Sequence, residues 1–141
     1  VSLDNNQEFL DKGRIAIDKL KYGNISQKLG DVRKLPYSDS SFTKVVCVSV
    51  LEHIEGGWEK GIDEMVRVLR PGGSLLLTFD VAVDGPLMGV NRNDFFVDRT
   101  VLRTILTKLG GKQELTENPI GASVFNGGLV IAAVMLRYVK L

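Results

Sequence analysis

The chain is poor in the features that mark secreted, membrane-spanning and nucleic-acid-binding proteins. It has a single cysteine, Cys47, so an internal disulfide is excluded and a reducing compartment is expected. Its longest apolar run, 129–136, falls far short of the roughly 18 residues that a membrane helix needs. The N-terminus lacks the basic and apolar regions of a signal peptide. These absences predict a cytoplasmic location with no membrane attachment.

Excess charge is absent as well. Eighteen basic and 17 acidic residues give a net charge of +1, so electrostatics provide no case for a nucleic-acid partner. We therefore expect no nucleic acid, and the balance weakly favours a small molecule or a saccharide as the substrate. The chain starts with Val1 rather than methionine, which leaves its natural start open.

The residues that are present suit one α/β domain, which we expect to span 1–141. A length of 141 residues with 44% hydrophobic content is enough to fill one core. Short apolar runs alternate with helical periods, which is typical of βαβ units and a mostly parallel sheet. The strands expected from these runs are 1–3, 25–29, 45–50 and 74–79, with a final antiparallel pair, 112–116 and 129–137, and the expected helices are 6–21, 58–69 and 98–109.

Two further predictions are specific enough for a structure to contradict them. The continuous apolar run 45–50 predicts a strand buried on both faces. The segments 81–97 and 117–128 have no clear period and predict loops.

Three sequence motifs occur in a fixed order along the chain. They are GDVRKLPYSDSSF at 30–42, VSVLEHI at 48–54 and EMVRVLRPGG at 64–73. In this combination the chain resembles the class I S-adenosylmethionine-dependent methyltransferases, in particular the broad subgroup with small-molecule and quinone-biosynthesis members. The resemblance implies a Rossmann-like three-layer sandwich with a mostly parallel sheet and a C-terminal antiparallel hairpin. It also implies S-adenosylmethionine as the cofactor.

The resemblance assigns cofactor-binding roles to five residues. Asp4, after the first short strand, would bind both ribose hydroxyls, because a carboxylate accepts two hydrogen bonds from a vicinal diol. Asp31 would accept from the adenine amino group, and the backbone N–H of Val32 would meet a ring nitrogen. Ser49 and Val50 would lie beside the methionine part. Structural alternatives remain open: Asp4 as the cap of the following helix and Asp31 as an ordinary turn residue.

No catalytic residue is identified. His53, the only histidine, is a weak candidate for a general base, because it titrates near neutrality. Its motif is frequent in family members with very different substrates, so we expect it to orient the loop instead. Cys47 lies among valines and is expected to be a buried, inert thiol. Arg67 and Arg70 are expected to favour the dipole at the C-terminus of their helix.

The sequence lacks the family's glycine-rich loop, of the form acidic-x-Gly-x-Gly. In the family this loop and the strand before it precede the position of Val1, so the fold is expected to be truncated at its N-terminus. The absent strand is central in the family's sheet, and two unpaired strand edges should result. A homodimer through these edges is one expectation, and a partner segment that completes the sheet is another.

The predicted function is methyl transfer from S-adenosylmethionine to an unidentified small-molecule or saccharide acceptor. The loops 81–97 and 117–128 would recognise that acceptor. The alternative is a non-catalytic methyltransferase-like module that acts through a protein partner. A nicotinamide-dependent oxidoreductase is a distant third hypothesis, because it also needs the glycine fingerprint.

Overall fold

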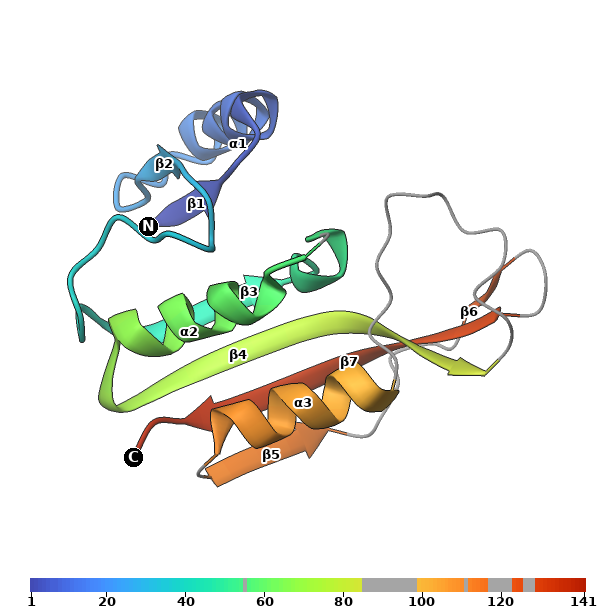
Figure 1. Cartoon of the computed structure of the whole chain (residues 1–141). Helices are drawn as coiled ribbons and strands as arrows, with labels where there is room; N and C mark the ends of the chain where they lie inside the picture. Colours follow the sequence, from blue (N-terminus) through green and yellow to red (C-terminus); the bar gives the residue numbers. More distant parts are fainter. Residues whose placement is uncertain (55, 85–98, 111, 117–122, 126–128) are drawn as a thin grey trace.

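The computed structural model describes the chain except residues 55, 85–98, 111, 117–122 and 126–128. Its strands form two separate sheets (Figure 1). The smaller one pairs β1 (Ser2–Asp4) with β2 (Gln27–Leu29) in parallel, and α1 (Gln7–Lys19) connects them. This βαβ unit is the one that the apolar runs 1–3 and 25–29 and the helical period of 6–21 indicate.

The larger sheet contains five strands. Its order is β3-β4-β7-β5, with β6 paired to β7. β3 and β4 run parallel, whereas β7 runs antiparallel to β4, β5 and β6. The Rossmann-like α/β fold and its C-terminal antiparallel strands are thereby confirmed. The bounds are β3 (Phe42–Val48), β4 (Leu69–Asp84), β5 (Lys112–Thr116), β6 (Ser123–Phe125) and β7 (Leu129–Val139).

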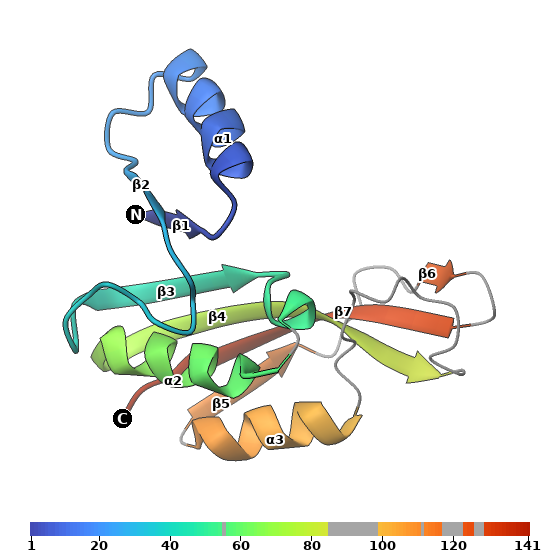
Figure 2. The ribbon, with the colours of Figure 1, turned by 45° about the horizontal axis from the view of Figure 1, so that its top comes forward.

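Two helices cover one side of the larger sheet (Figure 2). They are α2 (Trp58–Val68) and α3 (Arg99–Leu109), and a short 3-10 helix, η1 (Leu51–His53), follows β3. The apolar face that the sequence predicts on α2 packs inward. The core consists of residues from these elements that are at most 7% exposed: Trp58, Ile62, Met65, Leu75, Leu77, Phe79, Ile105, Leu109, Leu136 and Tyr138.

The start of β4, directly after α2, is held by the residue that follows β7. Lys140 Nζ donates to the carbonyl oxygens of Val66 at 2.8 Å and Leu69 at 2.6 Å. These carbonyls lie at the end of α2, where helix carbonyls lack partners within the helix and a cation is favoured. The backbone of Lys140 also pairs with Gly72 and Gly73. The Pro-Gly-Gly turn is thus fixed from both sides.

The prediction of a strand buried on both faces is wrong for β3. Cys47 is 6% exposed, but Val46 and Val48 on the opposite face are 61% and 59% exposed. An apolar β-branched run indicates a strand, yet it cannot reveal whether a neighbour covers its second face. Here α2 packs against one face only, and no described residue buries the other.

Other boundaries differ in smaller ways. β4 continues through Asp84, so the loop expected from residue 81 starts later, and the rest of that segment lies outside the described residues. β6 lies within the segment expected to be a loop at 117–128. The N-cap of α1 is Asn6, which accepts from the backbone N–H of Glu8 at 2.9 Å, so the alternative role of Asp4 as helix cap is wrong.

The prediction of two unpaired strand edges is confirmed within the described residues. β1 pairs only with β2, and β3 pairs only with β4. Figure 2 shows β1 and β3 pointing the same way, and no described ladder connects them.

Gly73 tests the close packing of the Pro-Gly-Gly segment in the first part of β4. A Cβ at this position would lie 2.8 Å from the carbonyl oxygen of Arg70 and 2.9 Å from that of Thr43 on β3. We expect Gly73→Ala to lower the free energy of unfolding by about 1–3 kcal/mol, because the backbone cannot yield without strain. Urea denaturation measures this change.

Gly23→Ala is the matched control, because nothing lies within 4 Å of a Cβ there. It should change the free energy of unfolding by less than about 0.5 kcal/mol. Equal effects of the two substitutions would contradict the packing described for the turn.

Candidate functional site

The carboxyl ends of β1, β2 and β3 lie around one cavity of about 840 Å³. In open α/β sheets, ligands bind outside the carboxyl ends of the strands, where the order of strands reverses. Its wall includes all the residues predicted to bind the cofactor: Asp4, Asp31, Val32, Ser49 and Val50. Their roles remain predictions, but the structure brings them together from three different strand ends.

Asp4 ends β1 and holds the start of the next segment. Its Oδ1 accepts from the backbone N–H of Asn6 at 2.8 Å, while Oδ2 makes no hydrogen bond to a described residue. The backbone carbonyl of Asp4 accepts from the N–H of Gly30 at 2.9 Å, which ties this strand end to the Asp31 loop. One carboxylate oxygen and the open lone pairs of the other remain for a ligand.

Asp31 lies in a turn closed by its own side chain. Arg33 donates to it from the backbone N–H at 2.8 Å and from Nη2 at 2.6 Å, with Nε within 3.0 Å of both oxygens. These hydrogen bonds from Arg33 lower the pKa of Asp31, so the carboxylate is ionised at neutral pH. Its turn role and a ligand role are compatible, because an ionised carboxylate accepts at about four lone-pair positions.

Ser49 turns the chain sharply at the end of β3. Its φ is 48°, in the left-handed region, where a residue other than glycine costs about 1–2 kcal/mol. Its backbone N–H is held by Thr78 on β4, 3.0 Å from the carbonyl oxygen and 3.2 Å from Oγ1. This turn places Ser49 and Val50 on the cavity wall rather than in line with the strand.

His53 and Cys47 differ in exposure. His53 ends η1, is exposed and lies on the cavity wall, where its role as a base stays a prediction. Cys47 is 6% exposed, and burial raises the pKa of its thiol to about 12. The expected buried, unreactive thiol is therefore what the structure contains.

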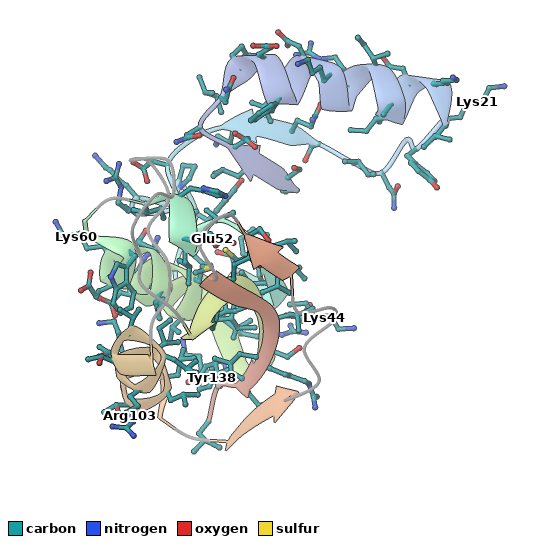
Figure 3. The ribbon with its side chains drawn as sticks, turned by 90° about the vertical axis from the view of Figure 1, so that its right-hand side faces the viewer. Lys21, Lys44, Glu52, Lys60, Arg103 and Tyr138 are labelled. Carbon is teal, nitrogen blue, oxygen red and sulfur yellow. The ribbon has the colours of Figure 1, made fainter. Side chains whose placement is uncertain are left out.

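Glu52, between the wall residues Val50 and His53, is a buried carboxylate that the sequence interpretation did not single out. It is 4% exposed, and neither carboxylate oxygen makes a hydrogen bond of standard geometry to a described residue. Figure 3 shows it inside the molecule, whereas Lys44 and Lys60 point outward. Burial raises the pKa of Glu52, and the nearby Asp80 carboxylate raises it further. Backbone hydrogen bonds and the charge of His53 act in the opposite direction and lower this pKa in part. The apolar residues Leu51 and Ile54 beside it in the sequence were the available indication that Glu52 lies in the interior.

Arg67 has a role that the helix-dipole interpretation did not include. Its guanidinium joins α2 to the segment 33–41, which we call the crossover. It donates to Glu64 at 2.6 and 2.8 Å, and to Asp39 and the carbonyls of Tyr37 and Leu35 at 2.8, 2.8 and 3.1 Å. Glu64 in turn accepts from the backbone N–H of Leu35 at 2.8 Å. The crossover that follows Asp31 is thus fastened to α2.

The described residues include no cluster of histidine, cysteine, aspartate or glutamate that could hold a metal ion. None of the helices in the described part of the chain has both the length and the apolar character to cross a membrane.

Arg67→Lys tests the fastening of the crossover. Lysine keeps the charge, but its ammonium has three donors, whereas the Arg67 guanidinium makes five hydrogen bonds. We expect the amide of Leu35 to exchange its hydrogen roughly tenfold faster or more, measured by hydrogen exchange and NMR. Arg70→Lys, on an exposed residue, is the control and should leave the exchange unchanged.

Glu52→Gln tests the buried carboxylate. Because the folded-state pKa of Glu52 is raised above 4.5, ionisation destabilises the fold once the pH passes the unfolded-state value. We expect the variant to unfold at higher denaturant than the parent at pH 7, with a difference that vanishes below about pH 4.5. Glu59→Gln should not stabilise, and a pH-independent effect of Glu52→Gln would contradict the assignment.

Three known proteins illustrate the similarity of this chain to others. Methyltransferase GfsG of Streptomyces halstedii is 33% identical over 86 residues, which are 61% of this chain and 30% of GfsG. The ubiquinone/menaquinone biosynthesis C-methyltransferase UbiE of Haemophilus ducreyi is 33% identical over 79% of this chain and 40% of its own. The structure of Haemonchus contortus phosphoethanolamine N-methyltransferase 2 with S-adenosyl-L-methionine superposes with a TM-score of 0.77 at 15% identity.

That superposition covers 98% of this chain and 42% of the nematode enzyme, and at this identity it shows the fold alone. The chain spans about a third of the length of the first curated relatives it matches: the matched segments are 30% of one relative and 32% of the other. Residues 1–77 match the family model described as a methyltransferase domain. Since this match covers more than half of the 141 residues, the chain belongs to the family of S-adenosylmethionine-dependent methyltransferase domains.

Proposed function

We propose that the protein containing this chain transfers a methyl group from S-adenosylmethionine to a small-molecule or saccharide acceptor. One observation carries the proposal: five residues from three separate strand ends, each predicted to bind the cofactor, line one cavity. The single-domain organisation of 1–141 is part of this proposal.

The residues present fit the adenosine part of the cofactor. Asp4 has an oxygen without a described partner, which suits the ribose hydroxyls. Asp31 is ionised and would accept from the exocyclic amine of adenine. The backbone N–H of Val32 makes no hydrogen bond to a described residue, so it is available to a ring nitrogen. A donor beside an acceptor reads the edge of adenine without any further side chain.

The chain's contribution to the reaction is positioning. When bound, the cofactor supplies an activated methyl group on a sulfonium, so the main requirement on the protein is alignment of the acceptor with that group. The rigid turn at Ser49, held by Thr78, would fix the wall beside the methionine part. His53, on the same wall, remains a weak candidate to take a proton from the acceptor, should the acceptor need to lose one.

The proposed chemical class of the acceptor rests on the net charge of this chain and on the names of its relatives. A net charge of +1 gives no electrostatic case for a nucleic-acid partner. Named relatives include a norajmaline N-methyltransferase and the quinone-biosynthesis C-methyltransferase, both named for small molecules. The segments predicted to recognise the acceptor lie largely outside the described residues.

A non-catalytic module is the second candidate. It is favoured by the two unpaired strand edges, which interrupt the sheet beside the cavity. The two candidates differ in one measurable property: a methyltransferase needs the adenosine site to bind, whereas a module that acts through a partner does not.

Calorimetric titration with S-adenosylhomocysteine tests the proposal. We expect saturable binding that Asp31→Asn weakens roughly tenfold to a hundredfold, because a charge-assisted hydrogen bond is lost. Asp18→Asn, on the exposed face of α1, is the control and should leave the affinity unchanged. Absence of heat at millimolar ligand with folded protein would overturn the cofactor site in this chain.

A further inference from the structure

Residues 49–53, which we call the wall segment, lie between the cavity and the interior of the protein. Three of them are on the cavity wall: Ser49, Val50 and His53. The two between them, Leu51 and Glu52, are 1% and 4% exposed. Because these five residues share one short stretch of backbone, a movement that brings Glu52 to water displaces the wall residues as well.

The wall segment is attached in a way that favours local opening. Two of the backbone hydrogen bonds that hold it, donated by the N–H groups of His53 and Ile54, are 3.1 and 3.2 Å long, at the long end of the usual range. Ser49 has a φ of 48°, which is strained for a residue other than glycine. Thr78 on β4 accepts the N–H of Ser49 with its carbonyl oxygen and Oγ1. Release of this N–H would relieve the strain, so the turn stores part of the free energy that opening requires.

The interior favours Glu52 as a neutral acid. Neither carboxylate oxygen has a hydrogen-bond partner of standard geometry among the described residues. A buried charge without a partner costs far more free energy than a buried neutral group. For this reason burial raises the pKa of Glu52 above its ordinary value of 4.5.

The ionisable groups around Glu52 come from three elements. In addition to burial, the charge of Asp80 on β4 raises the pKa of Glu52, whereas that of His53 on η1 lowers it. Cys47 on β3 stays a neutral thiol, since burial raises its pKa to about 12 and the charge of Glu52 adds to this. No described charged group of α2, which packs over the same core, shifts the pKa of Glu52. Ionised Glu52 is therefore driven toward water.

We propose that the wall segment is a pH-dependent switch of the cavity wall. While Glu52 holds its proton, the carboxyl group stays inside and the wall keeps its shape. When Glu52 releases its proton to water, the charged side chain turns outward, and Ser49 and Val50 move with it. The populations of the two arrangements then depend on pH. The consequence for the cofactor rests on the proposed function: the arrangement with neutral Glu52 binds it, so the affinity falls as the pH rises.

The first test follows the ligand-free, isotope-labelled chain by NMR from about pH 5 to about pH 9, a range that covers raised glutamate pKa values. The carboxyl carbon of Glu52 reports its ionisation, and the methyl groups of Val50 and Leu51 report the wall segment. We expect these signals to change along one curve with a midpoint above 4.5. Glu52→Gln and Glu52→Met, neither of which can ionise, should both abolish the methyl changes. His53→Gln should retain them.

The second test measures the affinity for S-adenosylhomocysteine by calorimetry on either side of that midpoint. We expect the parent chain to bind roughly tenfold or more weakly at the higher pH, because only the arrangement with neutral Glu52 binds. Glu52→Gln should bind equally at both pH values. Glu59→Gln, on α2 outside the wall segment, is the control and should keep the pH dependence of the parent.

The two tests separate the switch from the proposed function. Methyl signals that stay constant while Glu52 ionises, or no ionisation of Glu52 in this range, would overturn the switch. The same pH dependence of affinity in the parent and in Glu52→Gln would also overturn it. Absence of binding at every pH, with methyl signals that still follow Glu52, would support the switch and overturn only the proposed function.

Discussion

The structure contains two strand pairs that share no backbone hydrogen bonds, and the rest of the fold depends on the contacts that hold these pairs beside each other. β1 pairs with β2 and β3 with β4, but none of the described ladders connects one pair to the other. The crossover between β2 and β3 carries that connection, and Arg67 and Glu64 of α2 fix it through its backbone at Leu35 and Tyr37. Asp31 lies two residues before the crossover, so this anchoring also fixes the position of Asp31 on the cavity wall. Val32, the residue between them, packs beside Gly61 of α2.

Two carboxyl groups of the chain, Asp31 on the cavity wall and Glu52 in the interior, lie in opposite electrostatic environments. Asp31 is about two-fifths exposed, and hydrogen bonds from Arg33 lower its pKa, which keeps the carboxylate charged. Glu52, three residues after the turn at Ser49, is buried beside Asp80, and burial raises its pKa.

Much of the frame could be predicted from sequence because it depends on local patterns. The apolar period from Trp58 onward and the C-terminal antiparallel strands each reflect chemistry within a short segment. The resemblance to the family, rather than periodicity, singles out Asp4 and Asp31, and the structure places both on one cavity wall.

What sequence could not predict depends on distant contacts. Arg67 fits a helix C-terminus as well as it fits a crossover about 30 residues away, and only the tertiary structure selects the second. Glu52 looks like an ordinary exposed carboxylate until the turn at Ser49 directs it inward. The open face of β3 escaped prediction because a run of valines is compatible with one buried face or two.

The central claim is that Asp4, the Asp31 turn and the Ser49 turn form one wall of the proposed cofactor site, although the strands that carry them belong to two sheets. Titration of the isotope-labelled chain with S-adenosylhomocysteine, followed by amide NMR, tests this most directly. The account predicts that the amides of Asp4, Asp31, Val32, Ser49 and Val50 shift together with a single dissociation constant. Shifts confined to one of the three strand ends, or shifts only elsewhere in the chain, would contradict it.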